Sequence, residues 1–249
     1  MLALLLTLVA APPTAIAPAD SFRYRVVTKS IQEVDASALG QGSQTVEVTT
    51  TGLITLTLTD SAGGQVAHIT VDSAGMDGGE AMAMLGPEMT TVPKGVFFHF
   101  FVKDGKIVGD PSPSAMSLPV VNLMGAITVL FTNPRPTAKV GDLWTDTTRI
   151  DTTTAQGKTS GNNITNWKVA SMENGGLVLE AAIVGTMDVD SPMGKMTGST
   201  SGKQRLITRA KGGPLVSLTS DTINDMVMTM GTAAVNIKGT AKITVDPIR

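Results

Sequence analysis

Near its C-terminus the chain reads Val235-Asn-Ile-Lys-Gly-Thr-Ala-Lys-Ile-Thr-Val245, in which apolar and polar side chains alternate. Alternation with a period of two is typical of a β-strand that has one buried face and one solvated face. Strands of this kind belong to antiparallel sheets, because parallel sheets are covered on both faces and their strands are apolar throughout. The segment therefore predicts an antiparallel sheet with one apolar face.

The same alternation recurs along most of the chain. Ile54, Leu56 and Leu58 are separated by threonines, and the segment 177–188 follows the same rule. Glycine-rich turns separate these segments, and Asp104-Gly105 predicts a type I′ hairpin because both residues tolerate a positive φ. The pattern predicts about five strands before residue 110 and about six after residue 142.

Between these two halves the period changes. Val120, Leu123, Met124, Ile127 and Leu130 recur at helical spacing and predict a helix over 119–131. Its cap is expected at Ser112 or Ser114, with Pro119 in or near the first turn, although Pro119 and Gly125 could instead mark an irregular loop. A second short helix is expected over 80–89.

These elements predict a mainly β protein. We expect a curved antiparallel sheet or open half-barrel, with one or two helices packed on its apolar face. Nothing between the halves reads as a flexible linker, so residues 20–249 are interpreted as a single β-rich domain.

Composition excludes several classes of protein. The 249 residues include no Cys, which rules out disulfides, a cysteine-ligated zinc site and a thiol nucleophile. A net charge of −2 argues against general binding of nucleic acid, which requires a basic surface. With 42% hydrophobic and 16% charged residues, the chain is too apolar for a disordered protein.

Residues 1–19 are predicted to be a signal peptide. Their apolar run of about 10 residues is shorter than the roughly 20 that a membrane span needs. Ala17-Pro18-Ala19 offers a cleavage site, although no Lys or Arg precedes the run; the alternative is a buried N-terminal segment. We expect a periplasmic or extracellular protein with no transmembrane segment in its mature chain.

The segment 134–144 contains the most distinctive motif, Val140-Gly141-Asp142-Leu-Trp144, preceded by Pro136. Pro136 stiffens the approach, Gly141 and Asp142 favour a tight turn, and Trp144 can bury a large side chain at the start of a strand. We expect Asp142 to accept backbone N–H bonds inside this turn. The interpretation is structural, with contact to a ligand as the alternative.

This motif resembles the central Pro…Val-Gly-Asp-x-Trp segment of a family of secreted bacterial β-rich proteins of unknown function. The resemblance implies architecture and location, and it implies no chemistry. By pattern alone, the chain is also similar to the open β half-barrels of periplasmic lipoprotein and lipid carriers, in which helices close a curved sheet.

Catalytic motifs are not recognisable, and we expect neither enzymatic activity nor a cofactor or resident metal. His68 and His99 lie in predicted strands and are interpreted as structural. The run Gly198-Ser-Thr-Ser-Gly202 has Thr200 where a serine hydrolase has its nucleophile. Asp188 and Asp190 could suggest a calcium loop, but Pro192 occupies the next ligand position and Met193 the position of the loop glycine. The pair is interpreted as the solvated end of a strand.

Methionine is the anomaly of the composition. Met226, Met228 and Met230 share one face of a strand, while Met193-x-x-Met196 and the Met82/Met84 pair add two close groups. Three interpretations stay open. The methionines fill the core of a protein poor in aromatic residues, line a surface that adapts to apolar ligands, or bind Cu(I) through their thioethers.

The leading hypothesis is a non-catalytic envelope protein that holds a lipid or acyl chain between sheet and helix. Its expected lining is Leu56, Leu123, Met124, Ile127, Met226, Met228 and Met230. The alternative is a structural or interaction protein of the cell envelope, with an envelope protein as its partner. A long unpaired edge strand would favour this alternative. Copper binding is the third hypothesis.

Overall fold

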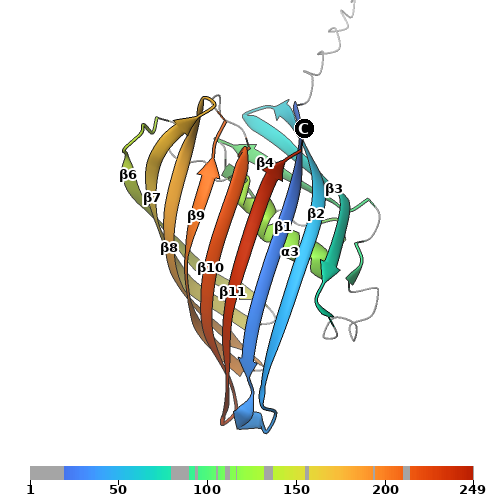
Figure 1. Ribbon diagram of the computed structural model, residues 1–249, viewed down its shortest axis with the longest axis vertical. Coiled ribbons are helices and arrows are strands. Elements are labelled where there is room, and N and C mark those ends of the chain that lie inside the picture. The colour runs from blue at the N-terminus through green and yellow to red at the C-terminus, as the bar shows by residue number, and fades with distance from the viewer. Residues whose placement is uncertain are drawn as a thin grey trace, which may run out of the picture.

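The structure, a computed structural model, describes residues 20–79, 90–92, 95–104, 106–109, 113–115, 117–131, 137–154, 157–192, 194–209 and 214–248. In these residues, eleven strands form one antiparallel sheet, and a helix packs against it (Figure 1). The strands are β1 (Asp20–Asp35), β2 (Ser43–Ser61), β3 (Gly64–Asp77), β4 (Phe97–Lys103), β5 (Lys106–Val108), β6 (Leu143–Thr154), β7 (Gly157–Glu173), β8 (Gly176–Ser191), β9 (Gly194–Ile207), β10 (Ser217–Met230) and β11 (Ala233–Pro247). The helix is α3 (Leu118–Val129), and a 3-10 turn, η1 (Ser37–Leu39), joins β1 to β2. The predicted fold class is confirmed.

Strand order explains why a helix crosses the sheet. The order is β5-β4-β3-β2-β1-β11-β10-β9-β8-β7-β6, so β5 and β6 are the two opposite edges. Because β5 and β6 are consecutive in sequence, the chain between them has to pass from one edge to the other. α3 lies in that connection and packs against β1, β2, β3 and β11.

The sheet has an inner face, which carries α3, and an outer face, on which no described helix lies. In Figure 1 the strands converge toward a narrow end, where η1 and the β10–β11 turn lie, and α3 lies behind β11, β1 and β2 near the wide end. The alternation in the sequence assigns the faces, since Ile54, Leu56 and Leu58 are buried on the inner face while the two threonines between them are half-buried.

The hydrophobic core lies at the wide end, between α3 and the inner face. Leu123 packs so closely on Gly52 of β2 that a Cβ at Gly52 would come within 2.9 Å of the leucine Cδ atoms. At the other end of the helix, the Leu215 N–H donates to the Leu130 carbonyl (3.1 Å), and the Tyr24 hydroxyl donates to the Leu215 carbonyl (2.7 Å). These bonds anchor α3 across the strands.

The start of the helix differs from the prediction in its cap. α3 begins at Leu118, which places Pro119 in the first turn, and its N-cap is Ser117, whose side chain makes no capping bond. Ser114 is not the cap, because its hydroxyl accepts the N–H of Phe97 (3.0 Å). The helix excludes an irregular loop at Pro119 and Gly125.

Several predictions fall outside the described residues. These are the signal peptide (1–19), the helix over 80–89, Ser112, Gly105 and Pro136. Asp104, the first residue of the predicted hairpin turn, is described and has a φ of 51°, as a type I′ turn requires. No helix in the described part of the chain is both long and apolar enough to cross a membrane.

Candidate functional site

The inner face changes character along its length, and the strand register defines three levels. At the wide end lies the buried core under α3. The second level is a polar belt, formed by side chains that are in register across β6, β7, β9, β10 and β1. The belt consists of Thr148, Asn163, Thr200, Asn224 and Gln32.

Beyond the polar belt, at the narrow end, the inner face is apolar again. The register places aliphatic and thioether side chains of five neighbouring strands side by side, and we call this group the methionine tip. It consists of Val34, Met187, Val189, Met196, Met226, Met228, Met230, Val235 and Ile237. Val235 is buried and the others are half-buried.

A glycine on β9 lets a methionine side chain of β10 pack directly against the strand backbone. Met226 faces Gly198 across the β9–β10 pair, and a Cβ at Gly198 would come within 2.6 Å of the Met226 Cγ. The Met226 side chain therefore lies over the Gly198 backbone. Met228 faces Met196 in the same strand pair, so thioether side chains from two strands meet at this level.

The structure divides the lining that the sequence predicted into two groups. Leu56, Leu123 and Ile127 are fully buried in the core, and Met124 packs against it from α3. Met226, Met228 and Met230 lie in the methionine tip instead. Through the register of β2, β1, β11 and β10, Leu56 and Met226 are twelve positions apart on β1, about 40 Å along the strands. The two groups are not brought together, and the role of either in ligand binding stays a prediction.

Met187, Val189 and Met196 were absent from the predicted lining, although the sequence carried a signal for them. Met187 continues the alternation of its strand, and Met196 was noted in a close pair of methionines. Their proximity to Met226 and Met228 depends on the register between strands, which alternation within one strand does not supply. Met193, the other member of that pair, lies outside the described residues.

The Val-Gly-Asp-x-Trp motif forms the turn that leads into β6. Gly141 has a φ of 96°, and the Asp142 carboxylate accepts the N–H of Lys139 (2.9 Å). Trp144 is 8% exposed and stacks on Trp167 of β7, with 5.9 Å between ring centroids. The contacts of this motif are those of a turn and a cross-strand aromatic pair.

Groups able to carry acid–base or metal chemistry are sparse on the inner face. His68 and His99 lie on the outer face, where His68 stacks on Phe97 at 5.0 Å between centroids. In the described residues, no cluster of three His, Cys, Asp or Glu side chains is placed to hold a metal ion. Copper binding by methionine thioethers stays a prediction.

One edge of the sheet is long. β6 has twelve residues and pairs only with β7 in the described sheet, so its other side is an edge. Exposed edges can recruit a further strand from another chain. This feature is the one named above as favouring an interaction protein, and that alternative stays a prediction.

Comparisons with known proteins add little to this description. No family model matches the chain, and no curated protein matches it significantly. One solved structure, described as "Lipid-protein interactions in lipovitellin", aligns with 92% of this chain and 25% of its own, with 12% sequence identity and a TM-score of 0.42. The chain thus spans about a quarter of that protein.

Proposed function

We propose that the protein binds an apolar or amphipathic ligand, such as a lipid or its acyl chain, on the inner face of its sheet. The methionine tip is the proposed seat of the apolar part. The proposal describes a non-catalytic binding protein, and residues 1–19 support a place for it in the periplasm or outside the cell.

The observation that carries the proposal is a half-buried apolar surface that forms no part of the described core. A contiguous apolar surface outside the core often marks a place where a ligand or partner binds. Its side chains are flexible and polarizable thioethers beside aliphatic groups, which adapt to ligands of varied shape. A rigid aromatic lining would select one shape; a methionine lining suits a class of chains.

The polar belt adds a second element to the site. Asn163 and Asn224 carry amide groups that both donate and accept hydrogen bonds, one level from the methionine tip. An amphipathic ligand can therefore place its chain at the tip and its polar group at the belt. This arrangement differs from the predicted one, in which the ligand lies directly under α3.

The test uses binding of an apolar fluorescent probe such as N-phenylnaphthylamine to the folded protein. The Met228→Asp variant places a charged carboxylate at the centre of the methionine tip, and an apolar probe that binds there has to desolvate it. We expect affinity to fall at least about tenfold, which corresponds to about 1.4 kcal/mol. Circular dichroism establishes that the variant is folded.

Thr229→Asp provides the matched control. Thr229 is the next residue along β10, is exposed, and points to the outer face. We expect this variant to bind the probe as the unchanged protein does. Equal binding by the Met228→Asp variant, or an equal loss in the Thr229→Asp variant, would contradict the proposal.

A further inference from the structure

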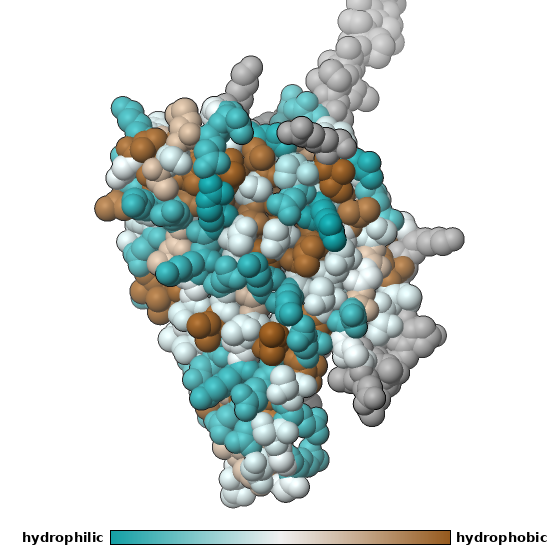
Figure 2. All heavy atoms as spheres, in the orientation of Figure 1, coloured by the Kyte–Doolittle hydropathy of each residue, from teal (hydrophilic) through white to brown (hydrophobic). Residues whose placement is uncertain are grey.

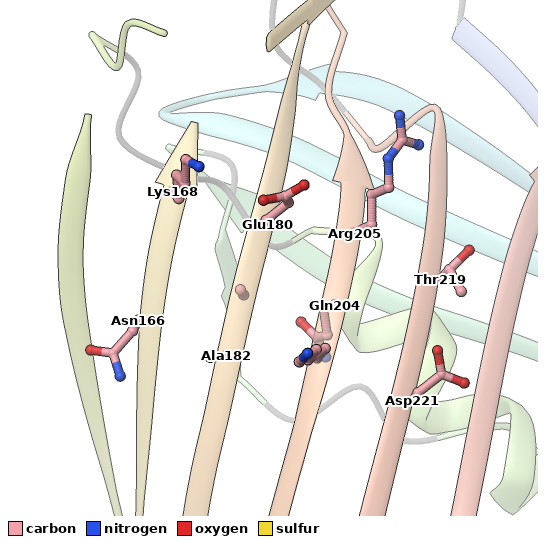
Figure 3. A pocket seen from close by; sticks show the side chains of 10 residues that line it. Asn166, Lys168, Glu180, Ala182, Gln204, Arg205, Thr219 and Asp221 are labelled. Atoms are coloured by element: carbon pink, nitrogen blue, oxygen red, sulfur yellow. The ribbon is translucent and has the colours of Figure 1, made fainter. Parts of the chain in front are cut away.

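The outer face of the sheet, which the proposed function does not use, carries a groove of about 660 Å³. The groove runs across β8, β9, β10, β11 and β1 on the side away from α3. A second hollow of about 500 Å³ adjoins it and shares Ala182, Lys203 and Asp221 with it. Figure 3 shows Lys168, Glu180, Arg205 and Asp221, which line this second hollow, on neighbouring strands with α3 behind them.

The floor of the groove is a row of side chains that crosses the strands at one level, in which three aliphatic residues alternate with a serine and a threonine. Val184 is in register with Ser201, Ser201 with Ile223, Ile223 with Thr240, and Thr240 with Ile31. Val184 is 54% exposed and Ile223 is 60% exposed. At about 4.8 Å per strand, the row from Val184 to Ile31 spans about 19 Å. Figure 2, which views the outer face, shows apolar patches among hydrophilic side chains here.

The walls of the two hollows are cationic, although the whole chain has a net charge of −2. Five cationic side chains line them (Lys29, Lys168, Lys203, Arg205 and Lys242), against two carboxylates (Glu180 and Asp221). Three of these cations are paired. The Lys242 ammonium lies 3.7 Å from the Asp221 carboxylate, the Lys29 ammonium lies 2.7 Å from that of Glu47, and the Arg205 guanidinium lies 2.8 Å from that of Glu173.

Lys203 differs from these two lysines. Asp221 faces Lys203 across the β9–β10 pair, yet no carboxylate in the described part of the chain lies within ion-pair distance of the Lys203 ammonium. It belongs to the wall that the two hollows share, two positions along β9 from Ser201 in the floor. An ammonium outside the ion pairs, beside a floor that carries Val184, Ile223 and Ile31, matches a ligand with an anionic head and a long apolar chain.

We propose that this groove is a second binding site, for a single-chain amphipathic anion of the long-chain carboxylate class. The carboxylate pairs with the Lys203 ammonium, and the chain lies across Ile223 toward Ile31. This site is independent of the methionine tip, because successive residues of a strand point to opposite faces of the sheet.

Laurate below its micelle concentration is the test ligand, and the methyl groups of isotope-labelled isoleucines are the NMR reporters. We expect laurate to shift the signals of Ile223 and Ile31. We expect Lys203→Gln to weaken this binding about fivefold, the change that an exposed ion pair of about 1 kcal/mol supports. Ile223→Ser should weaken it further by removing part of the floor.

Lys238→Gln is the matched control for the loss of one positive charge. Lys238 lies on the same face, on β11, and does not line either hollow. We expect this variant to bind laurate as the unchanged protein does. Dodecanol, which has the same chain without the charge, should bind at Ile223 more weakly than laurate.

Four outcomes would overturn the proposal. The first two are an absence of laurate-induced shifts at Ile223 and dodecanol binding as tightly as laurate. The other two are an equal loss of laurate affinity in the Lys203→Gln and Lys238→Gln variants, and recruitment of the protein to anionic vesicles without binding of monomeric laurate. None of them bears on the methionine tip, whose probe assay with Met228→Asp reports on the inner face alone.

Discussion

Tyr24 shows how one residue links β1 to the connection between β9 and β10. Its ring is fully buried, its hydroxyl donates to the Leu215 carbonyl, and the Arg209 guanidinium lies 3.4 Å from the hydroxyl oxygen. Burial raises the pKa of Tyr24 above the ordinary value of 10.0, while the hydrogen bond and charge of Arg209 oppose that rise. The net effect keeps the phenol protonated in the folded protein.

This raised pKa predicts how stability depends on pH. Between pH 10.0 and the folded pKa, the unfolded chain releases a phenolic proton that the folded chain retains, so the free energy of unfolding falls as pH rises. The chain has one tyrosine, so absorbance titration of the phenolate reports on Tyr24 alone. We expect its midpoint in the folded protein to lie above that in urea.

The Tyr24→Phe variant is the control for this assignment. It should lose the phenolate signal and the alkaline fall in stability that belongs to Tyr24. At neutral pH the substitution should lower the free energy of unfolding by about 1 kcal/mol, because the Leu215 carbonyl loses its hydrogen-bond donor. A phenol that titrates at the same pH in folded and unfolded protein would show that burial does not govern this group.

At the residue scale, the sequence predicted which side chains are apolar and share a face better than it predicted their neighbours on other strands. That Met226, Met228 and Met230 share a face follows from alternation alone. That they are separated from Leu56 by the polar belt does not, since Asn163 and Thr200 lie on other strands and reach this level only through the register. The predicted lining therefore consists of apolar side chains at two separate places, and its role in binding stays a prediction.

At the scale of elements, α3 shows what spacing can and cannot establish. The pattern predicted the helix to within a few residues, because Val120, Leu123 and Ile127 recur at 3.6-residue spacing and are buried. It did not predict the cap. Ser114 bonds to β4 instead, and that contact arises from tertiary packing rather than from local sequence.

Two substitutions in α3 test whether the helix is held by its buried side. Leu123 is fully buried over Gly52, whereas Val121 is 43% exposed. We expect Leu123→Ala to lower the free energy of unfolding by about 2–5 kcal/mol, through lost burial and the cavity left behind. Val121→Ala should change it by less than about 1 kcal/mol.

Urea unfolding followed by circular dichroism gives both values. Similar costs for the two substitutions would mean that α3 is not docked through Leu123. The two positions are well matched, because both carry a branched aliphatic side chain and they lie two residues apart in one helix.

At the scale of the whole molecule, the strand order accounts for the architecture. Because β5 and β6 are opposite edges, the connection that contains α3 has to cross a face of the sheet, and it covers the wide end. The sequence predicted a curved sheet with a helix on its apolar face, and that prediction is confirmed. It supplied no strand order, since pairing of β1 with β11 joins segments about 200 residues apart in the chain.

The alternation of side chains along each strand separates the two proposed binding surfaces. The methionine tip is apolar and lies on the inner face, while the groove is apolar and cationic and lies on the outer face. Since the two surfaces alternate along the same strands, substitutions one residue apart act on different faces.

The most direct test of ligand binding at the methionine tip is NMR of the labelled methionine methyl groups during titration with a neutral lipid, such as a monoacylglycerol. The signals of Met187, Met196, Met226 and Met228, assigned by single substitutions, should shift together and saturate at one ligand per chain. Unmoved signals at these four methionines, under conditions in which the lipid binds elsewhere or does not bind, would contradict the account.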